Sequence, residues 1–263
     1  MHVHGFYQES QSFHQQALTV RKHVFGSEHP DVAESLNALG LLARFQGDYE
    51  GAKAFHSQAL SIREKTLGPN HPLTAQSVNN LGVLYRNQGL YEQAEPLLEK
   101  AFSIREQSLG SEHPETLNSL INIAKFYLEQ QKYKQAELLA QQALTLSERI
   151  LEPGHNLTPQ SLNLLAKLSF EQGNYERAEA FWQRNLALVE QTFGPEHAST
   201  AECLNDLAEL YVVLGRYTQA EYLCQRSLTI CEHVLRYDHP DTVTVRKHLA
   251  KIVNKRAEEQ GNS

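Results

Sequence analysis

The chain has 263 residues, of which 41% are hydrophobic and only 8% aromatic. Its formal net charge of −7 argues against nucleic acids and anionic membrane surfaces as partners, because both attract basic faces. No apolar run approaches the roughly 18 residues that a membrane-spanning helix needs, and the polar N-terminus lacks the basic and apolar regions of a signal peptide. The three cysteines, Cys203, Cys224 and Cys231, have neither disulfide-framework nor zinc-site spacing. We therefore expect buried thiols, no membrane association and a cytoplasmic protein.

The first predicted element is a helix over residues 6–25. Its apolar residues, among them Phe13, Ala17 and Leu18, recur at helical spacing and match the second helix of the repeat described next. No first helix precedes it. Two explanations stay open: the chain was cut from a larger protein, or this orphan helix has another partner, such as a second copy of the chain.

From residue 29 onward, the sequence repeats itself every 42 residues. Columns of histidine, tyrosine and alanine keep this period. The histidines are His29, His71, His113, His155, His197 and His239; the tyrosines are Tyr49, Tyr91, Tyr133, Tyr175 and Tyr217; the alanines are Ala52, Ala94, Ala136, Ala178 and Ala220. A fixed period of this size indicates a solenoid, in which each unit buries its apolar face only against its neighbours.

Each unit has the pattern of an antiparallel helical hairpin. In residues 71–109, His71-Pro72 opens the first helix, Gly89 ends it as a left-handed residue, and Tyr91 begins the second helix. The same spacing predicts five full repeats, at residues 29–67, 71–109, 113–151, 155–193 and 197–235.

The chain departs from this pattern at two places. In the fourth repeat Glu152-Pro153-Gly154 replaces the usual turn, so that Thr158 is expected to cap a late helix start. A last helix over residues 239–256 carries Arg246 where the other units place an apolar residue, as the polar terminal cap of a solenoid would.

Small residues in both helices favour close helix packing over HEAT or armadillo repeats, which the period alone would also suit. The order Leu81-Gly82-x-x-Tyr85, then Gly89-x-Tyr91-x-x-Ala94-Glu95, resembles the tetratricopeptide repeat (TPR). With Ile104-Arg105-Glu106, Leu109-Gly110 and His113-Pro114, it is similar to the 42-residue kinesin light chain type, which nephrocystin-like and bacterial scaffold proteins share. The resemblance covers residues 5 to about 252. It implies an all-α fold, a right-handed TPR superhelix (α-solenoid) of antiparallel helical hairpins, spanning residues 1–263 as one domain.

Asparagine recurs in one column in the middle of the first helices, although its amide competes with the helical backbone. The members are Asn37, Asn79, Asn163 and Asn205, and Ile121 interrupts the series. In the tetratricopeptide hairpin this column faces the concave groove, and in kinesin light chains the matching asparagines contact cargo peptides. The resemblance thus implies a groove in which amides bond to an extended peptide backbone. The alternative is that each asparagine bonds to the neighbouring repeat and fixes the stacking.

Other side chains of the same face would give selectivity. Arg44 and Arg86 share a column with Leu128, Phe170 and Val212, so this face changes from basic to apolar along the chain. Lys125 and Lys167 lie between. We expect acidic side chains of a ligand at the two arginines and a bulky apolar anchor near the later residues. Kinesin light chains resemble this in taking acidic peptides with an aromatic anchor.

Catalysis and metal binding find little support in the sequence. It contains no G-x-S-x-G, no phosphate-binding glycine loop and no H-E-x-x-H. The periodic histidines are a helix pair apart and thus too distant to share a zinc ion, so we expect them to satisfy backbone groups at helix starts. We expect no enzyme, metal or cofactor, but a scaffold or adaptor that binds an extended segment of a protein partner. The alternative is a structural or self-associating spacer module of a larger multidomain signalling protein.

Overall fold

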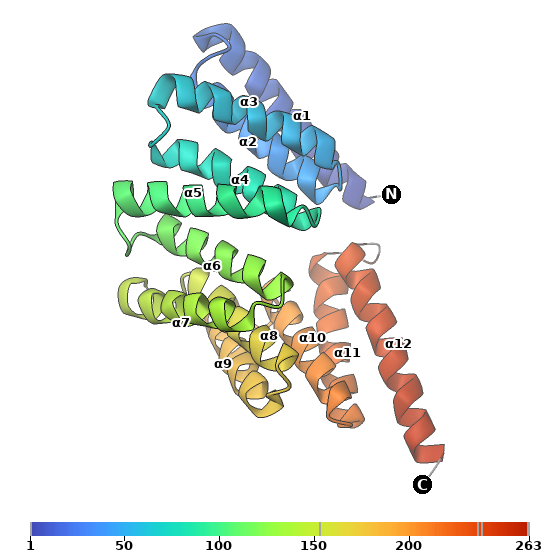
Figure 1. Ribbon diagram of the computed structural model, residues 1–263. Coiled ribbons are helices and arrows are strands. Elements are labelled where there is room, and N and C mark those ends of the chain that lie inside the picture. Colours follow the sequence, from blue (N-terminus) through green and yellow to red (C-terminus); the bar gives the residue numbers. More distant parts are fainter. Residues whose placement is uncertain (1, 153, 236, 238, 262–263) are drawn as a thin grey trace. The chain divides into compact units, whose positions relative to one another are not determined.

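The computed structural model describes residues 2–152, 154–235, 237 and 239–261, and over those residues the chain is all-α, with twelve helices and no strand. Figure 1 shows the helices in chain order. They are α1 (His2–Phe25), α2 (Pro30–Phe45), α3 (Tyr49–Leu67), α4 (Pro72–Asn87), α5 (Tyr91–Leu109), α6 (Pro114–Glu129), α7 (Tyr133–Ile150), α8 (Leu157–Glu171), α9 (Tyr175–Phe193), α10 (Ala198–Val213), α11 (Tyr217–Val234) and α12 (Pro240–Gly261). We call the first helix of each repeat (α2, α4, α6, α8, α10) helix A and the second (α3, α5, α7, α9, α11) helix B.

The chain forms two compact units, His2–Leu139 and Ala140–Ser263, with the boundary inside α7. In the N-terminal unit, α2 pairs with α3 and α4 with α5, while α1 packs on α2, α3 on α4 and α5 on α6. In the C-terminal unit, α8 pairs with α9 and α10 with α11, while α9 packs on α10 and α11 on α12. Helices therefore pack chiefly against their neighbours in the sequence, as in a helical-repeat array.

The periodic histidines cap the helices that follow them. In each case the ring Nδ1 accepts a hydrogen bond from the backbone N–H two residues later, at distances from 3.1 to 3.3 Å. The expected role at helix starts is thus confirmed for all six histidines: His29, His71, His113, His155, His197 and His239. Each cap satisfies one of the N–H groups that have no acceptor within the helix.

Small residues let the two helices of a hairpin approach each other closely. A Cβ atom on Gly40 would lie 2.6 Å from the imidazole of His56, and one on Gly82 would lie 2.9 Å from Leu98. The helix B alanines Ala52, Ala94, Ala136, Ala178 and Ala220 are all fully buried.

Helix B meets the next helix A at a junction that differs along the chain. In the first three junctions a serine lies opposite an arginine: Arg21 with Ser35, Arg63 with Ser77, and Arg105 with Ser119. Arg63 and Arg105 are fully buried. The repeat places Ser147 and Ser161, Val189 and Cys203, and Cys231 and Val245 at the equivalent positions of the last three junctions. The polar arginine–serine pair is thus replaced by small or apolar residues in the second half of the chain.

Candidate functional site

The 42-residue period places four asparagines on helices A, and each bonds to another helix. Asn37 donates from Nδ2 to Ser77 Oγ at 3.2 Å, and its Oδ1 lies 3.0 Å from His56 Nδ1. Asn79 Oδ1 accepts from Asn122 Nδ2 at 3.2 Å. Only 5% of Asn37 and 5% of Asn79 is exposed. In the N-terminal unit these amides therefore join helices, which favours the stacking role.

The asparagines of the C-terminal unit follow the same two bonding modes. Trp182 Nε1 donates to Asn163 Oδ1 at 2.8 Å, as His56 does to Asn37 from the equivalent position of its own hairpin. His248 Nδ1 lies 2.9 Å from Asn205 Oδ1, and it occupies the position that Asn122 holds in the N-terminal unit. Asn163 and Asn205 stay half-buried. Asn37 and Asn163 thus accept a hydrogen bond within their own hairpin, while Asn37, Asn79 and Asn205 bond to α4, α6 and α12, the next helices of the array.

Two arginines form the basic part of helices A in the N-terminal unit. Burial lowers the pKa of the Arg44 guanidinium, and the charge of Arg86 lowers it further. Burial also lowers the pKa of Arg86, while Glu129 opposes this effect from an Nε–Oε1 distance of 3.4 Å. The Arg86 side chain is only 10% exposed, and its Nη1 is buried without a hydrogen-bond partner among the described residues. The pair therefore holds more buried positive charge than Glu129 alone balances.

The predicted cationic and apolar positions lie partly in each unit. Lys125 is close enough to Glu129 to lower its pKa, against the larger effect of burial, which raises it; Leu128 is half-buried. In the C-terminal unit, Phe170 and Val212 are half-buried and pack on the hydrophobic core around Trp182.

Lys167 forms an ion pair with Asp206, with Nζ and Oδ2 3.4 Å apart. Burial raises the pKa of the Asp206 carboxyl to about 6, although Lys167 opposes this shift. One predicted cation of this face is therefore engaged by a carboxylate that sequence reasoning did not single out.

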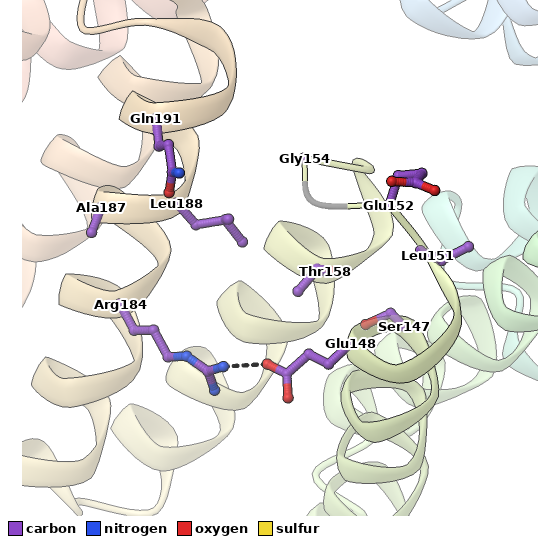
Figure 2. A pocket seen from close by; sticks show the side chains of 10 residues that line it. All are labelled: Ser147, Glu148, Leu151, Glu152, Gly154, Thr158, Arg184, Ala187, Leu188 and Gln191. Atoms are coloured by element: carbon purple, nitrogen blue, oxygen red, sulfur yellow. Dashed lines mark hydrogen bonds and ion pairs between the residues drawn. The ribbon is translucent and has the colours of Figure 1, made fainter.

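Among the described residues of the C-terminal unit, two hollows lie at junctions that lack the buried arginine. The first has a volume of about 490 Å³ and is lined by side chains of α7, α8 and α9 and the preceding turn, including Ser147. Figure 2 shows Arg184 of α9 reaching Glu148 of α7 in an ion pair at this hollow. We call it the B-side hollow, because helices B supply most of its lining.

The second hollow has a volume of about 400 Å³ and is lined by residues of α10, of α12 and of the C-terminal end of α11. We call it the A-side hollow. Its lining consists of Ala198, Ser199, Ala201, Glu202, Asn205, Cys231, Leu235, Asp241, Thr244 and Val245. Of the sequence-predicted site residues, it contains Asn205. The hollow itself was not predicted from the sequence, although the presence of Cys231 in the column of Arg63 and Arg105 would have indicated it.

Among the described residues, no group of three or more histidine, cysteine or acidic side chains could hold a metal ion. In the same part of the chain, no helix has the length and apolar character needed to cross a membrane.

The successive hairpins, their small contact residues and their capped helix starts define a helical-repeat protein. A family model described as Tetratricopeptide repeat matches residues 4–65, 45–106, 76–149 and 157–217, and a second model of that description matches residues 200–241. These matches span most of the sequence, and the chain belongs to the tetratricopeptide repeat family. A comparison with curated protein sequences found no match.

Solved structures with the same fold include proteins of the kinesin light chain type. The putative kinesin light chain TPR-like repeats of Podosopora anserina share 26% identity, at a TM-score of 0.61 over 79% of this chain and 99% of theirs. BtubC (BKLC) of P. vanneervenii shares 20% identity, at a TM-score of 0.67 over 89% of this chain and 94% of its own. NprR, solved in complex with its cognate peptide NprX, shares 15% identity, at a TM-score of 0.68 over 97% of this chain and 69% of its own. The resemblance to kinesin light chain-type repeats is thereby confirmed.

Proposed function

We propose that the chain is a non-catalytic adaptor that binds an extended segment of a protein partner along its helices A. Acidic side chains of that segment would contact Arg44 and Arg86. The observation that carries this proposal is the buried Nη1 group of Arg86, which has no hydrogen-bond partner among the described residues. A buried guanidinium without its full set of acceptors is costly, and a carboxylate of a ligand would supply them.

The family and one structural neighbour support a peptide ligand. TPR arrays expose the faces of many helices in series, a surface suited to extended segments. NprR was solved with its cognate peptide bound. On this chain, Leu128, Phe170 and Val212 would offer apolar contacts further along the helices A, and Lys125 and Lys167 would add positive charge.

The four asparagines of the helices A have two different roles in this proposal. Because Asn37 and Asn79 are buried and bond to neighbouring helices, we assign them to stacking. Asn163 and Asn205 are half-buried and remain candidates for contact with the ligand.

The test starts with affinity capture of partners by the whole chain, followed by mapping of the bound segment with synthetic peptides. The double variant Arg44→Gln/Arg86→Gln should weaken the mapped peptide about tenfold or more, because two charge-assisted hydrogen-bonding groups are lost. Arg226→Gln is the matched control, since Arg226 pairs with Glu190 on helices B at 2.6 Å. It should leave the affinity within about twofold. Equal affinities for the double variant and the wild type would exclude this surface.

A second experiment uses Glu129, whose carboxylate would compete with the ligand for Arg86. Glu129→Gln removes the charge that now faces Arg86, so an acidic peptide should bind more tightly to this variant than to the wild type. Weaker binding would mean that Glu129 helps to hold the ligand and that Arg86 does not meet an acidic group.

Self-association through α1 is the second candidate function. Phe13, Val20 and Val24 lie on one face of α1 and are 68%, 60% and 61% exposed. In α3 the equivalents of the first two, Phe55 and Ile62, pack against the hydrophobic cluster of their hairpin. Light scattering tests this candidate: a dimer that Val20→Gln dissociates would support it, and a monomer at about 100 μM would exclude it.

A further inference from the structure

The first junctions of the chain show how its repeat holds a guanidinium group. Arg63 Nη1 donates to the backbone oxygen of Leu73 at 2.8 Å, to Gln76 Oε1 at 2.9 Å and to Ser77 Oγ at 3.0 Å. Arg21 and Arg105 donate to the equivalent backbone oxygen and serine hydroxyl. One set of repeat positions therefore accepts hydrogen bonds from a guanidinium in three successive junctions.

The A-side hollow lies at these same positions of the last junction. Four of its lining residues, Cys231, Asp241, Thr244 and Val245, are the repeat equivalents of Arg63, Leu73, Gln76 and Ser77. Cysteine is much shorter than arginine, and the hollow of about 400 Å³ is found where the arginine side chain would otherwise extend. The junction has thus lost its guanidinium and kept the space.

The hollow has also kept negative charge. Burial lowers the pKa of Arg63, and the neighbouring Glu34 carboxylate raises it; the repeat equivalent of Glu34 is Glu202, which lines the hollow. Asp241 adds a second carboxylate, and the described residues that line the hollow include no lysine, arginine or histidine. The N-termini of α10 and α12 contribute roughly half a positive charge each, so the two carboxylates still outweigh them.

The nearby His239 uses its Nδ1 as a hydrogen-bond acceptor. This nitrogen is 3.5 Å from the Asp241 carboxylate and accepts a hydrogen bond from the Asp241 backbone N–H. The B-side hollow differs from the A-side hollow, because the chain's own Arg184 already faces its Glu148.

We infer that the A-side hollow receives an arginine side chain of the bound partner segment. The aliphatic part of the arginine would lie against Ala201 and Val245, and the guanidinium would meet the carboxylates of Glu202 and Asp241. A planar guanidinium suits several acceptors at once better than an ammonium does, which is the reason for arginine over lysine. The inference rests on the proposed function, because the arginine belongs to the partner segment that is proposed to bind along the helices A. In the sequence, this subsite lies near the C-terminal end, whereas Arg44 and Arg86 lie near the N-terminal end.

The test uses small probes and local resonances. The ¹⁵N-labelled chain is titrated with N-acetyl-arginine amide, while the backbone amide signals of Thr244 and Val245 are followed by NMR. A saturating shift with a dissociation constant on the order of 1 mM is expected for a single side chain. N-acetyl-citrulline amide has nearly the same shape without the charge, and it should bind at least about tenfold more weakly. Equal binding of the two probes would overturn the inference.

Two variants locate the binding. Glu202→Gln should weaken the arginine probe about tenfold, because it removes one carboxylate while preserving the shape of the side chain. Cys231→Arg/Val245→Ser rebuilds the arginine–serine pair of the first junctions, and the chain's own guanidinium should abolish the response. If that double variant fails to fold, Glu202→Gln alone decides, and an unchanged affinity in it contradicts the inference.

The outcome is separable from that of the proposed function. The arginine titration reports on the C-terminal unit alone, whereas Arg44→Gln/Arg86→Gln tests the N-terminal unit. Once a partner segment is mapped, Glu202→Gln should weaken it about tenfold, and replacing its arginine by citrulline should have a similar effect. A segment that binds Glu202→Gln as well as the wild type would overturn the inference even if the probe binds.

Discussion

The buried arginines at the junctions illustrate, at the scale of single residues, how one repeat position can be filled in two ways. Burial lowers the pKa of Arg105, while its bonds to the Glu115 backbone and carboxylate and to Ser119 Oγ compensate the lost hydration. Val189 and Cys203 replace such a pair later in the chain without any charge to compensate. The two members of a pair depend on each other, because a lone buried polar group is costly.

We expect Arg105→Val to lower the free energy of unfolding by about 3 kcal/mol, since it leaves a cavity and a buried serine hydroxyl without its donor. Arg105→Val/Ser119→Cys, which copies the later pair, should recover at least about 1 kcal/mol of this loss. Urea unfolding followed by circular dichroism measures both values. Strictly additive effects of the two substitutions would show that the positions are not coupled.

The raised pKa of Asp206 makes a pH prediction. Its value of about 6 in the folded chain lies above that of an ordinary carboxyl, so the folded state binds more protons than the unfolded state between about pH 4 and 6. The stabilising effect of protonation is present below that range and is lost as the pH rises through 6. Asp206→Asn should therefore be more stable than the wild type at pH 7.5. The gain should be on the order of 1 to 2 kcal/mol, because the loss of the ion pair with Lys167 offsets part of it.

The advantage of Asp206→Asn should disappear below about pH 4, and a difference independent of pH would contradict it. His56 has the opposite effect on the pH dependence of stability. Burial, together with the charges of Arg44 and Arg63, lowers the pKa of His56 to about 4. The folded state therefore loses stability through His56 as the pH falls from about 6.5 to 4. Because both proteins contain His56, the difference between their unfolding curves isolates Asp206.

At the scale of helices, the sequence predicted the order and number of elements well, because glycine, proline and histidine signals mark their ends. Three boundaries differ. The orphan helix begins at His2, before residue 6; the last helix runs to Gly261, beyond residue 256; and α8 begins at Leu157, before Thr158 could cap it. The last helix has no stop signal between residues 256 and 260, and good helix formers such as Ala257 and Glu258 extend it.

The hydrogen-bond partners of the four asparagines could not be predicted from the asparagine positions of the repeat alone. They depend on what faces each one: His56 and Trp182 donate within the hairpin, while Asn122 and His248 come from the next first helix. The hollows likewise follow from two columns read together, since the arginine and serine columns change in concert. Periodicity identifies buried positions, but the partner of a polar side chain is set by helix packing.

Gly40→Ala tests the close approach of α2 and α3. The added Cβ would be 2.6 Å from the His56 ring, which is itself fully buried and cannot move away. We expect a loss of about 1 to 2 kcal/mol, although alanine is the better helix former, because overpacking a rigid ring outweighs that gain. Gly40→Ala/His56→Cys copies the equivalent pair Ala208 and Cys224 and should be less destabilised than Gly40→Ala. Thermal unfolding compares them, and a stabilised single variant would contradict the predicted clash.

At the scale of the whole molecule, stability should be local. Within each unit nearly all helix contacts join neighbours in the sequence, so a substitution has few routes to distant helices. Hydrogen exchange should therefore show faster exchange in α5 and α6 of Arg105→Val, with α10 and α11 unchanged. Uniformly faster exchange in all helices would instead indicate that the chain opens as a single cooperative unit.

The six histidine caps distribute the stabilisation of helix starts along the chain. Each uses a ring nitrogen as acceptor for the backbone N–H two residues later, and each serves a different helix. Removal of one cap would thus leave the other five in place. The described helix starts therefore do not share one point of failure, in contrast to a protein in which they converge on a single buried cluster.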